Sequence, residues 1–433
     1  MMSKISVDFT KQEGKMKIMH AINNGPKKPM AVQCRGNFNE WVEAEIPYSR
    51  NHDASSGNEH IVDVWSIFPN PDADVNDPAS YDFQLTDEYI QNILEAGTKI
   101  FYRLGNKIEH WSKKYGTLPP KDFKKWAEIC EHIIMHYNEG WADGFRYNIE
   151  YWEIWNEPDM HDDEDVHKET WGGTKAQFFD FYEIAAKHLK NRFPHLKIGG
   201  PALSHRVDWA EDFIVEMRKR NVPLDFFSWH RYCPEPDWML TRQEKLKKIL
   251  DDNGYADVET ICNEWNYIKG GTGWTTDFVY SIQTIISMKG AAFTASCMLA
   301  AQHSTVDMLM YYDARLCAFN GLFDFYTCQP LKTYYVFTMF RDVYKLGTSY
   351  DVEISDNDIY CVAAKNGEDE AIMISFYNDN DEDNSIKTID LDINGKEEYD
   401  LYILDEDHNY EKVGAYKKGT PLNIKHNTVI MLK

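Results

Sequence analysis

Residues 151–159 read Tyr151-Trp152-Glu153-Ile154-Trp155-Asn156-Glu157-Pro158-Asp159, a short run of large apolar and aromatic side chains that ends abruptly in Asn-Glu-Pro. The run is too short and too aromatic to favour a helix, and Pro158 interferes with further regular strand pairing. We therefore predict a buried strand that carries Glu157 at its C-terminal end. In a barrel of eight parallel strands, catalytic groups collect at this end.

A second glutamate stands in a matching position. Glu264 closes the β-branched run 258–264 and is followed by Trp265-Asn266-Tyr267 and a glycine-rich loop. A lone carboxylate could be a structural cap, but two carboxyls at the ends of two strands are the minimum equipment for cleaving a glycosidic bond with retention. One acts as nucleophile and the other as proton donor, with the carboxyls about 5–5.5 Å apart.

These motifs resemble those of clan A glycoside hydrolases, and more narrowly those of glycoside hydrolase family 39, which includes β-xylosidases and α-L-iduronidases. The resemblance covers residues 16–345 and rests on Asn156-Glu157-Pro158 and on Glu264 with its aromatic-Asn continuation. It implies a (β/α)8 TIM barrel in which Glu157, ending strand four, is the acid/base and Glu264, ending strand seven, is the nucleophile. It also implies that Asn156 contacts the sugar 2-hydroxyl.

Four further polar residues are candidates for the site. Family 39 carries an Arg-x-His pair similar to Arg50 and His52, in which the histidine reaches a sugar hydroxyl. The alternative for Arg50 is a buried ion pair beneath the nucleophile. The pattern Ser228-x-His230-x-Tyr232 resembles the clan's arrangement of a histidine and a tyrosine beside the nucleophile, where a tyrosine hydroxyl can keep the carboxylate ionised. The alternative for His230 and Tyr232 is a pair satisfied within the core.

The aromatic residues next to the glutamates complete the predicted site. We expect Trp155 and Trp265 to line it, with Trp155 as an apolar wall that raises the pKa of Glu157. Many clan A members also place a tryptophan platform at the end of strand eight, and this sequence has none there. The candidates to replace it, each with simple packing as the alternative, are Tyr311, Tyr312 and Trp274.

The length of 433 residues exceeds the roughly 250 of a bare barrel by enough for an accessory domain. We predict a TIM barrel over residues 14–345 and an accessory antiparallel β-sandwich formed by residues 1–13 plus 346–433, where short alternating strands are separated by Asn/Asp/Gly turns. Within the barrel we expect a helix at 274–288, the eighth strand at 291–300, and a pocket wall formed by the long connection 54–83.

Composition and charge exclude several partners. The 46 basic and 70 acidic residues give a net charge of −24, which opposes binding to nucleic acid or to an anionic membrane. The eight cysteines form no Cys-x-x-Cys pair, which favours buried free thiols, and no metal or cofactor is predicted. The start of the chain shows no apolar leader, so we expect a cytoplasmic protein, or a secreted one if a signal peptide has been removed.

The combined prediction is a retaining glycoside hydrolase, exo-acting on β-xylosides or related plant-derived oligosaccharides. The same mechanism on arabinosides, galactosides or uronides is the first alternative, and a uronide would need a cationic clamp such as Arg231 or Lys269. A non-catalytic carbohydrate-binding protein on a barrel scaffold is a more remote alternative, because such a protein needs no matched pair of glutamates. The sequence leaves the anomer, the linkage and the oligomeric state open, a homo-oligomer included.

Overall fold

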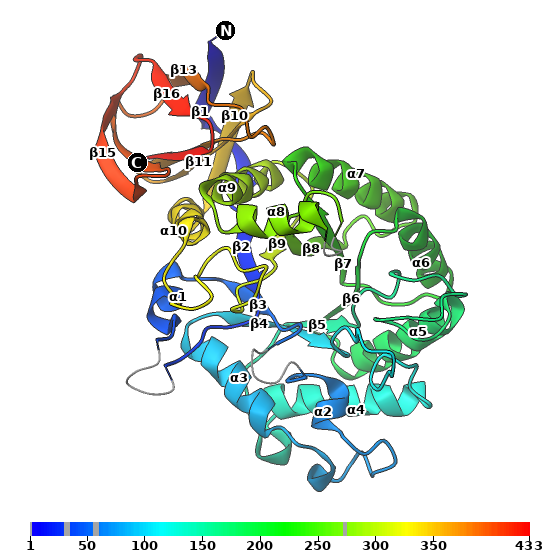
Figure 1. Cartoon of the computed structure of the whole chain (residues 1–433). Coiled ribbons are helices and arrows are strands. Elements are labelled where there is room, and N and C mark those ends of the chain that lie inside the picture. Colours follow the sequence, from blue (N-terminus) through cyan, green and yellow to red (C-terminus); the bar gives the residue numbers. More distant parts are fainter. Residues whose placement is uncertain (1, 30–34, 55–59, 272–274) are drawn as a thin grey trace.

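A closed barrel of eight strands forms the centre of the computed structural model, which describes residues 2–29, 35–54, 60–271 and 275–433 (Figure 1). All neighbouring strands in the barrel are parallel. In order around the barrel, the strands are β2 (Ile18–Asn23), β3 (Tyr48–Arg50), β4 (Lys99–Leu104), β5 (Tyr151–Ile154), β6 (Lys197–Leu203), β7 (Phe226–Cys233), β8 (Glu259–Tyr267) and β9 (Met308–Tyr311). The predicted TIM barrel is confirmed.

Helices surround the barrel and bury their apolar faces against it (Figure 1). Local sequence sets where several of them begin: Asp122 caps one helix, and Thr174 forms a reciprocal capping box with Gln177 at the start of another. The α-helices are α1 (Phe38–Ala44), α2 (Val64–Ile67), α3 (Gln84–Glu95), α4 (Phe123–Asn138), α5 (Lys175–Arg192), α6 (Val207–Lys219), α7 (Pro236–Asp252), α8 (Thr276–Ile285), α9 (Met288–Gln302) and α10 (Lys332–Tyr344).

The prediction of the eighth strand at 291–300 is wrong. Residues Met288–Gln302 form helix α9, and β9 (Met308–Tyr311) closes the barrel between β2 and β8. The alanine-rich run has high helix propensity, but α9 is buried on nearly every side because it lies between the barrel and the C-terminal sheet. A helix buried all round lacks the polar face that marks a helix in sequence, and its small residues then resemble a barrel strand.

The interior of the barrel is layered. Eight apolar side chains that point inward near the beginnings of the strands form a separate cluster: Ala21, Tyr48, Phe101, Tyr151, Phe226, Ile261, Met308 and Met310. Above this plug, toward the C-terminal ends of the strands, the buried residues are polar and charged, among them Arg50, Glu153 and Asn263. The plug therefore closes the bottom of the barrel, and the polar layer forms the floor of any site at the top.

A nine-stranded sheet forms the second part of the molecule and packs beside α9 and α10 (Figure 1). Its strands are antiparallel except where β1 (Ser3–Lys15) runs parallel to β13 (Ile386–Ile393). The other strands are β10 (Thr348–Ile354), β11 (Ile359–Asn366), β12 (Asp369–Phe376), β14 (Glu398–Leu404), β15 (Asn409–Lys417), β16 (Leu422–Lys425) and β17 (Thr428–Leu432). The N-terminal strand thus pairs with β10 and β13, more than 300 residues away in sequence.

Two further features concern the cysteines and the apolar length of the helices. The seven cysteines in the described part of the chain are free, and six of them are buried. Across the described ranges no single helix is long and apolar enough to cross a membrane. Only α8 and α9 taken together, with a bend of 77° between them, reach the required length and apolar composition.

Candidate active site

Glu157 reaches the barrel interior through a turn at the end of β5. Trp155 and Glu157 both have left-handed backbone conformations, with φ of 74° and 47°, which is uncommon for residues other than glycine. This turn breaks the alternation of the strand, so the Trp155 ring points outward to the helices while Asn156 and Glu157 face inward. The backbone is held in place by hydrogen bonds from Glu157 N to Ala202 O and from Thr170 Oγ1 to Glu157 O.

Glu264 is placed by an irregularity in β8. Trp229 on β7 pairs with Cys262, but the next residue, His230, pairs with Glu264, so Asn263 is an extra residue in β8. As a result Asn263 and Glu264 both contact the barrel interior, where Asn263 Nδ2 bonds Glu153 and Glu264 bonds Arg50. The bulge therefore brings the carboxyl of Glu264 to face β5.

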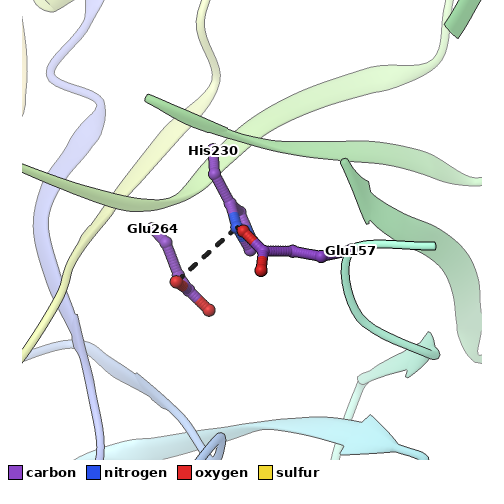
Figure 2. Close-up of side chains that lie close together, drawn as sticks. All are labelled: Glu157, His230 and Glu264. Carbon is purple, nitrogen blue, oxygen red and sulfur yellow. Dashed lines mark hydrogen bonds and ion pairs between the residues drawn. The ribbon is translucent and has the colours of Figure 1, made fainter. Parts of the chain in front are cut away.

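The two carboxyls share one space with His230 (Figure 2). One oxygen of Glu157, one oxygen of Glu264 and a ring nitrogen of His230 all lie within 4.8 Å of one another. His230 Nδ1 lies 2.8 Å from Glu157 Oε1 and 3.5 Å from Glu264 Oε2. All three side chains are buried, so the pair meets in a site with little access to bulk water.

The environments of the two carboxyls differ. Glu264 accepts hydrogen bonds from Arg50 Nη1 at 2.7 Å and from the Tyr232 hydroxyl at 2.9 Å. Among the described residues, the side chain of Glu157 has a hydrogen bond only with the ring of His230. Burial raises the pKa of Glu157 to about 8, and the nearby Asp159 carboxylate adds to the shift. Burial raises the pKa of Glu264 as well, but the Arg50 charge and hydrogen bond oppose it. At neutral pH Glu157 is therefore the protonated carboxyl of the pair and Glu264 is the ionised one.

The neutral state of His230 follows from its own surroundings. Burial lowers its pKa to about 4, which outweighs the attraction of Glu264. A neutral imidazole beside Glu157 can accept a hydrogen bond from the protonated carboxyl through Nδ1 or donate one to the carboxylate, depending on its tautomer. His230 can thus remain hydrogen-bonded to Glu157 in both protonation states of that carboxyl without changing its own charge.

Arg50 organises the floor beneath the carboxyls. Its guanidinium, which is fully buried, contacts Glu153 Oε2 at 2.6 Å, Glu264 Oε1 at 2.7 Å and Asn156 Oδ1 at 2.7 Å. Glu153 in turn accepts hydrogen bonds from Ser228 Oγ at 2.6 Å and from Asn263 Nδ2 at 2.5 Å. Arg50 is therefore an ion-pair partner beneath the predicted nucleophile, which was the alternative to a direct sugar contact.

Glu153 and Asn263 were not among the predicted site residues. A signal existed for Glu153, a charged residue inside an otherwise apolar strand. For Asn263 the sequence shows only a polar residue before Glu264, because its inward position depends on the bulge in β8. Asn23 belongs to the same network, since its Oδ1 accepts from Arg50 Nη1 at 3.2 Å.

Comparison with known proteins assigns the family. The profile of Glycosyl hydrolases family 39 matches residues 42–422, which is most of the chain. This protein belongs to glycosyl hydrolase family 39.

Individual relatives are distant. A β-xylosidase of Geobacillus stearothermophilus is 28% identical over 221 residues, which cover 43% of this chain and 41% of that protein. The human α-L-iduronidase is 24% identical over 234 residues, covering 48% of this chain and 33% of that protein. The matches thus span less than half the length of these curated relatives. Among solved structures, a glucosidase from Croceicoccus marinus superposes with a TM-score of 0.79 at 21% identity, covering 100% of this chain and 98% of that one.

In this family 39 chain, several buried polar atoms around the carboxyls lack a partner. His52 is 1% exposed, with Nε2 3.9 Å from Glu264 Oε1, and neither ring nitrogen has a hydrogen-bond partner among the described residues. The same holds within that part of the chain for Asn156 Nδ2, His230 Nε2 and Asp53 Oδ1. Donors and acceptors left open in a buried site suit a ligand rich in hydroxyl groups.

The structure does not bring Trp155 and Trp265 to the carboxyl pair. The Trp155 ring packs against Trp126 and Phe181 of the outer helices, and its Nε1 donates to Thr170 O. Trp265 packs against Phe293 of α9 and Tyr311, because it follows Glu264 directly and so faces the other side of β8. Both lie in the core between barrel and helices, where neither ring can line the sugar site.

The aromatic residue at the end of the eighth barrel strand is Tyr312. Its ring lies 6.4 Å from that of Tyr232, and its hydroxyl lies 3.3 Å from Asp53 Oδ2. Tyr311 points outward to Trp265 and Phe337, and Trp274 lies outside the described residues. Of the platform candidates that the structure describes, Tyr312 is therefore the one on the side of the nucleophile.

A metal ion does not fit between the carboxyls. Glu157, His230 and Glu264 form the only cluster with metal-ligand spacing in the described ranges. However, Arg50 and the Tyr232 hydroxyl each already bond one oxygen of Glu264, so a cation there would lie close to a buried guanidinium.

Proposed function

We propose that this protein is a retaining glycoside hydrolase that removes β-linked xylose, or a closely related neutral sugar, from the end of plant-derived oligosaccharides. The observation that carries the proposal is the carboxyl pair, whose facing oxygens lie within 4.8 Å while only one member is bonded to a cation. This separation suits the short spacing of retaining enzymes, about 5–5.5 Å between carboxyls, and is shorter than the roughly 6.5–9.5 Å at which an inverting enzyme accommodates its attacking water beside the sugar.

The two protonation states assign the steps. Glu264, ionised beside Arg50 and Tyr232, attacks the anomeric carbon while Glu157 donates its proton to the departing oxygen. Once the sugar is bound covalently to Glu264, that carboxyl carries no negative charge, so the pKa of Glu157 falls. Glu157 then takes a proton from water, which attacks the same carbon and releases the sugar with its configuration retained.

The two predicted cationic clamps do not support a uronide. Lys269, one predicted clamp, is paired with Asp379 at 2.7 Å. Arg231, the other, lies between two inward-facing residues of β7 and has its guanidinium 5.7 Å from the Trp238 ring. The xylose assignment follows the names of the matched β-xylosidases, and exo action remains part of the proposal.

The test is a stereochemical and product analysis. Proton NMR during hydrolysis of 4-nitrophenyl β-xyloside should show β-xylose as the first product, followed by mutarotation. A 2-deoxy-2-fluoro-β-xylosyl fluoride should label Glu264, as read by peptide mass spectrometry. First appearance of α-xylose would contradict the double displacement. An absence of turnover on xylosides, arabinosides, galactosides and glucosides alike would favour the carbohydrate-binding alternative.

A further inference from the structure

A groove of about 770 Å³ lies outside the carboxyl site, between the connection that follows β3 and the connection that follows β4. Its volume is in the range of small-molecule sites. Much of its surface comes from flat or rigid apolar side chains, including Trp65, Tyr115, Pro119 and Pro120, and its rim carries charged residues such as Asp72 and Lys121. Trp65 lies on α2 and Trp126 lies on α4, and both residues line the groove.

Two buried polar groups line this groove without a partner. Asn106 is 7% exposed and Trp126 is fully buried, yet Asn106 Oδ1 and Trp126 Nε1 make no hydrogen bond to any described residue. A buried donor or acceptor without a partner is costly, so such groups are usually satisfied by a ligand or by water. Tyr115 is 72% exposed, which leaves an aromatic face available beside them.

One contact links the groove to the segment that carries the proton donor. Gly105 contacts both sides: its carbonyl accepts a hydrogen bond from Val64 N, and a Cβ at its position would lie 3.3 Å from Trp155 Cα. Trp65 and Asn106 in the groove are each one residue from this contact. Glu157 is two residues from Trp155, in the turn that follows the neighbouring strand β5. The loops that form the two sites also bond to each other, through Glu109 N to Glu169 O and Gly172 N to Thr117 O.

We propose that this groove binds sugar units of the leaving group, several units away from the bond that is cleaved. The proposal rests on the proposed function, because in a retaining hydrolase the proton donor marks the side on which the leaving group departs. Aromatic faces suit the apolar faces of pyranose rings, while the unpartnered amide oxygen of Asn106 and the charged rim suit their hydroxyls. Binding energy from these remote units would help to position the reacting sugar.

The test measures how affinity depends on chain length. In the full chain carrying Glu264→Gln, which prevents turnover, isothermal titration calorimetry compares β-1,4-xylobiose with β-1,4-xylohexaose, and the corresponding β-1,4-glucose dimer and hexamer. For whichever of the two sugars the unsubstituted protein hydrolyses, the hexamer should bind at least tenfold more tightly than the dimer. Adding Tyr115→Ala or Trp65→Ala should remove most of that gain and change dimer affinity less than twofold. Trp238→Ala, which removes an exposed aromatic ring at the start of α7, should keep the gain.

Each other outcome overturns the proposal. Equal affinity for dimer and hexamer of both sugars would show that the groove holds no sugar chain. An equal loss for dimer and hexamer in Tyr115→Ala and Trp65→Ala would place their effect in the inner site or in the fold. If an apolar alcohol such as 2-naphthol bound in the groove and sugar affinity showed no chain-length effect, the groove would be assigned to an apolar ligand instead. Failure of the proposed function is read separately, as absence of turnover of the dimers by the unsubstituted chain.

Discussion

At the level of single residues, the site depends on two glutamates whose oxygens meet different partners. Glu264 accepts hydrogen bonds from the guanidinium of Arg50 and the hydroxyl of Tyr232. Glu157 is hydrogen-bonded to the neutral imidazole of His230. Because a carboxylate is stabilised by donors and by positive charge, these contacts separate the pKa values of two otherwise equivalent side chains. Two predictions follow from this asymmetry, one on leaving groups and one on pH.

Replacing each glutamate by alanine should affect substrates differently. Glu264→Ala should abolish turnover of all glycosides, because no nucleophile remains. Glu157→Ala should lower kcat/KM about 10²–10⁴-fold for glycosides with alkyl or sugar leaving groups, and far less for 2,4-dinitrophenyl glycosides, which depart without a proton. Initial rates on both substrate types give the comparison. Equal losses on both types in Glu157→Ala would argue against its role as the acid.

The pH dependence should report the same pair. The pKa of Glu157 is raised to about 8, so kcat/KM for a glycoside that needs protonation should stay high at neutral pH and fall as the pH rises through about 8. On the acid side kcat/KM should also fall, as Glu264 becomes protonated. This fall should occur at a higher pH than for an ordinary glutamate, because burial raises the pKa of Glu264. In Glu157→Gln, measured with the same glycoside, the alkaline limb should disappear from the residual activity. An alkaline limb that persists in Glu157→Gln would assign it to another group.

At the level of elements, four strands are joined by one buried charge network. Arg50 on β3, Glu153 on β5 and Asn263 on β8 meet beneath the carboxyls, together with Ser228 on β7. A buried charge that loses its partner is strongly destabilising, whereas removal of both charges often is not. The network therefore allows its contribution to folding to be separated from its contribution to catalysis.

Arg50→Met should lower the free energy of unfolding by about 3–5 kcal/mol, because Glu153 then remains buried without a cation. Arg50→Met combined with Glu153→Met should recover most of the stability but not the activity, since Glu264 still lacks its cationic donor. Urea unfolding and kcat/KM supply the two readouts. Lys345→Met, which removes a solvent-exposed ion pair with Glu45, is the control and should change stability little. A double variant no more stable than Arg50→Met would contradict the pairing.

At the level of the whole molecule, the C-terminal sheet is bonded to the strand that carries Glu264. Asp379, at the turn after β12, accepts hydrogen bonds from Tyr267 at the end of β8 and pairs with Lys269 at 2.7 Å and Lys289 at 2.6 Å. The Tyr377 hydroxyl also donates to Pro234 O, just after β7. The sheet thus fixes the exits of the two strands that hold Tyr232 and Glu264.

Asp379→Asn should weaken this connection by about 2 kcal/mol in the free energy of unfolding at pH 7. Burial alone would raise the pKa of Asp379, but the bonds from Lys269, Lys289 and Tyr267 outweigh it and lower the pKa below its usual value. The contribution is therefore present above the unfolded pKa of about 4 and is lost as the pH falls through the lower folded value. Urea unfolding at pH 7 and pH 3 measures it, with the exposed Glu382→Gln as control. A difference that does not shrink at acid pH would contradict this assignment.

The sequence by itself determined the fold class and the two glutamates. Strand and turn chemistry are local, so a buried aromatic run that ends in Asn-Glu-Pro, and a β-branched run that ends in Asn-Glu, could be placed at strand ends without knowledge of the rest of the chain. The pattern Ser228-x-His230-x-Tyr232 was placed beside the predicted nucleophile by its resemblance to the clan, and its residues share one face because alternate residues of a strand do.

Only the tertiary structure decided which neighbours of those residues face the site. The left-handed turn at Trp155 and the extra residue Asn263 in β8 break the alternation that sequence reasoning assumes, which turns Trp155 outward and Asn263 inward. Helix α9 was mistaken for a strand because its burial on all sides depends on a sheet formed by residues far away in sequence. The partners of Arg50 likewise come from several strands, and a pairing across a barrel leaves no periodic trace in the chain.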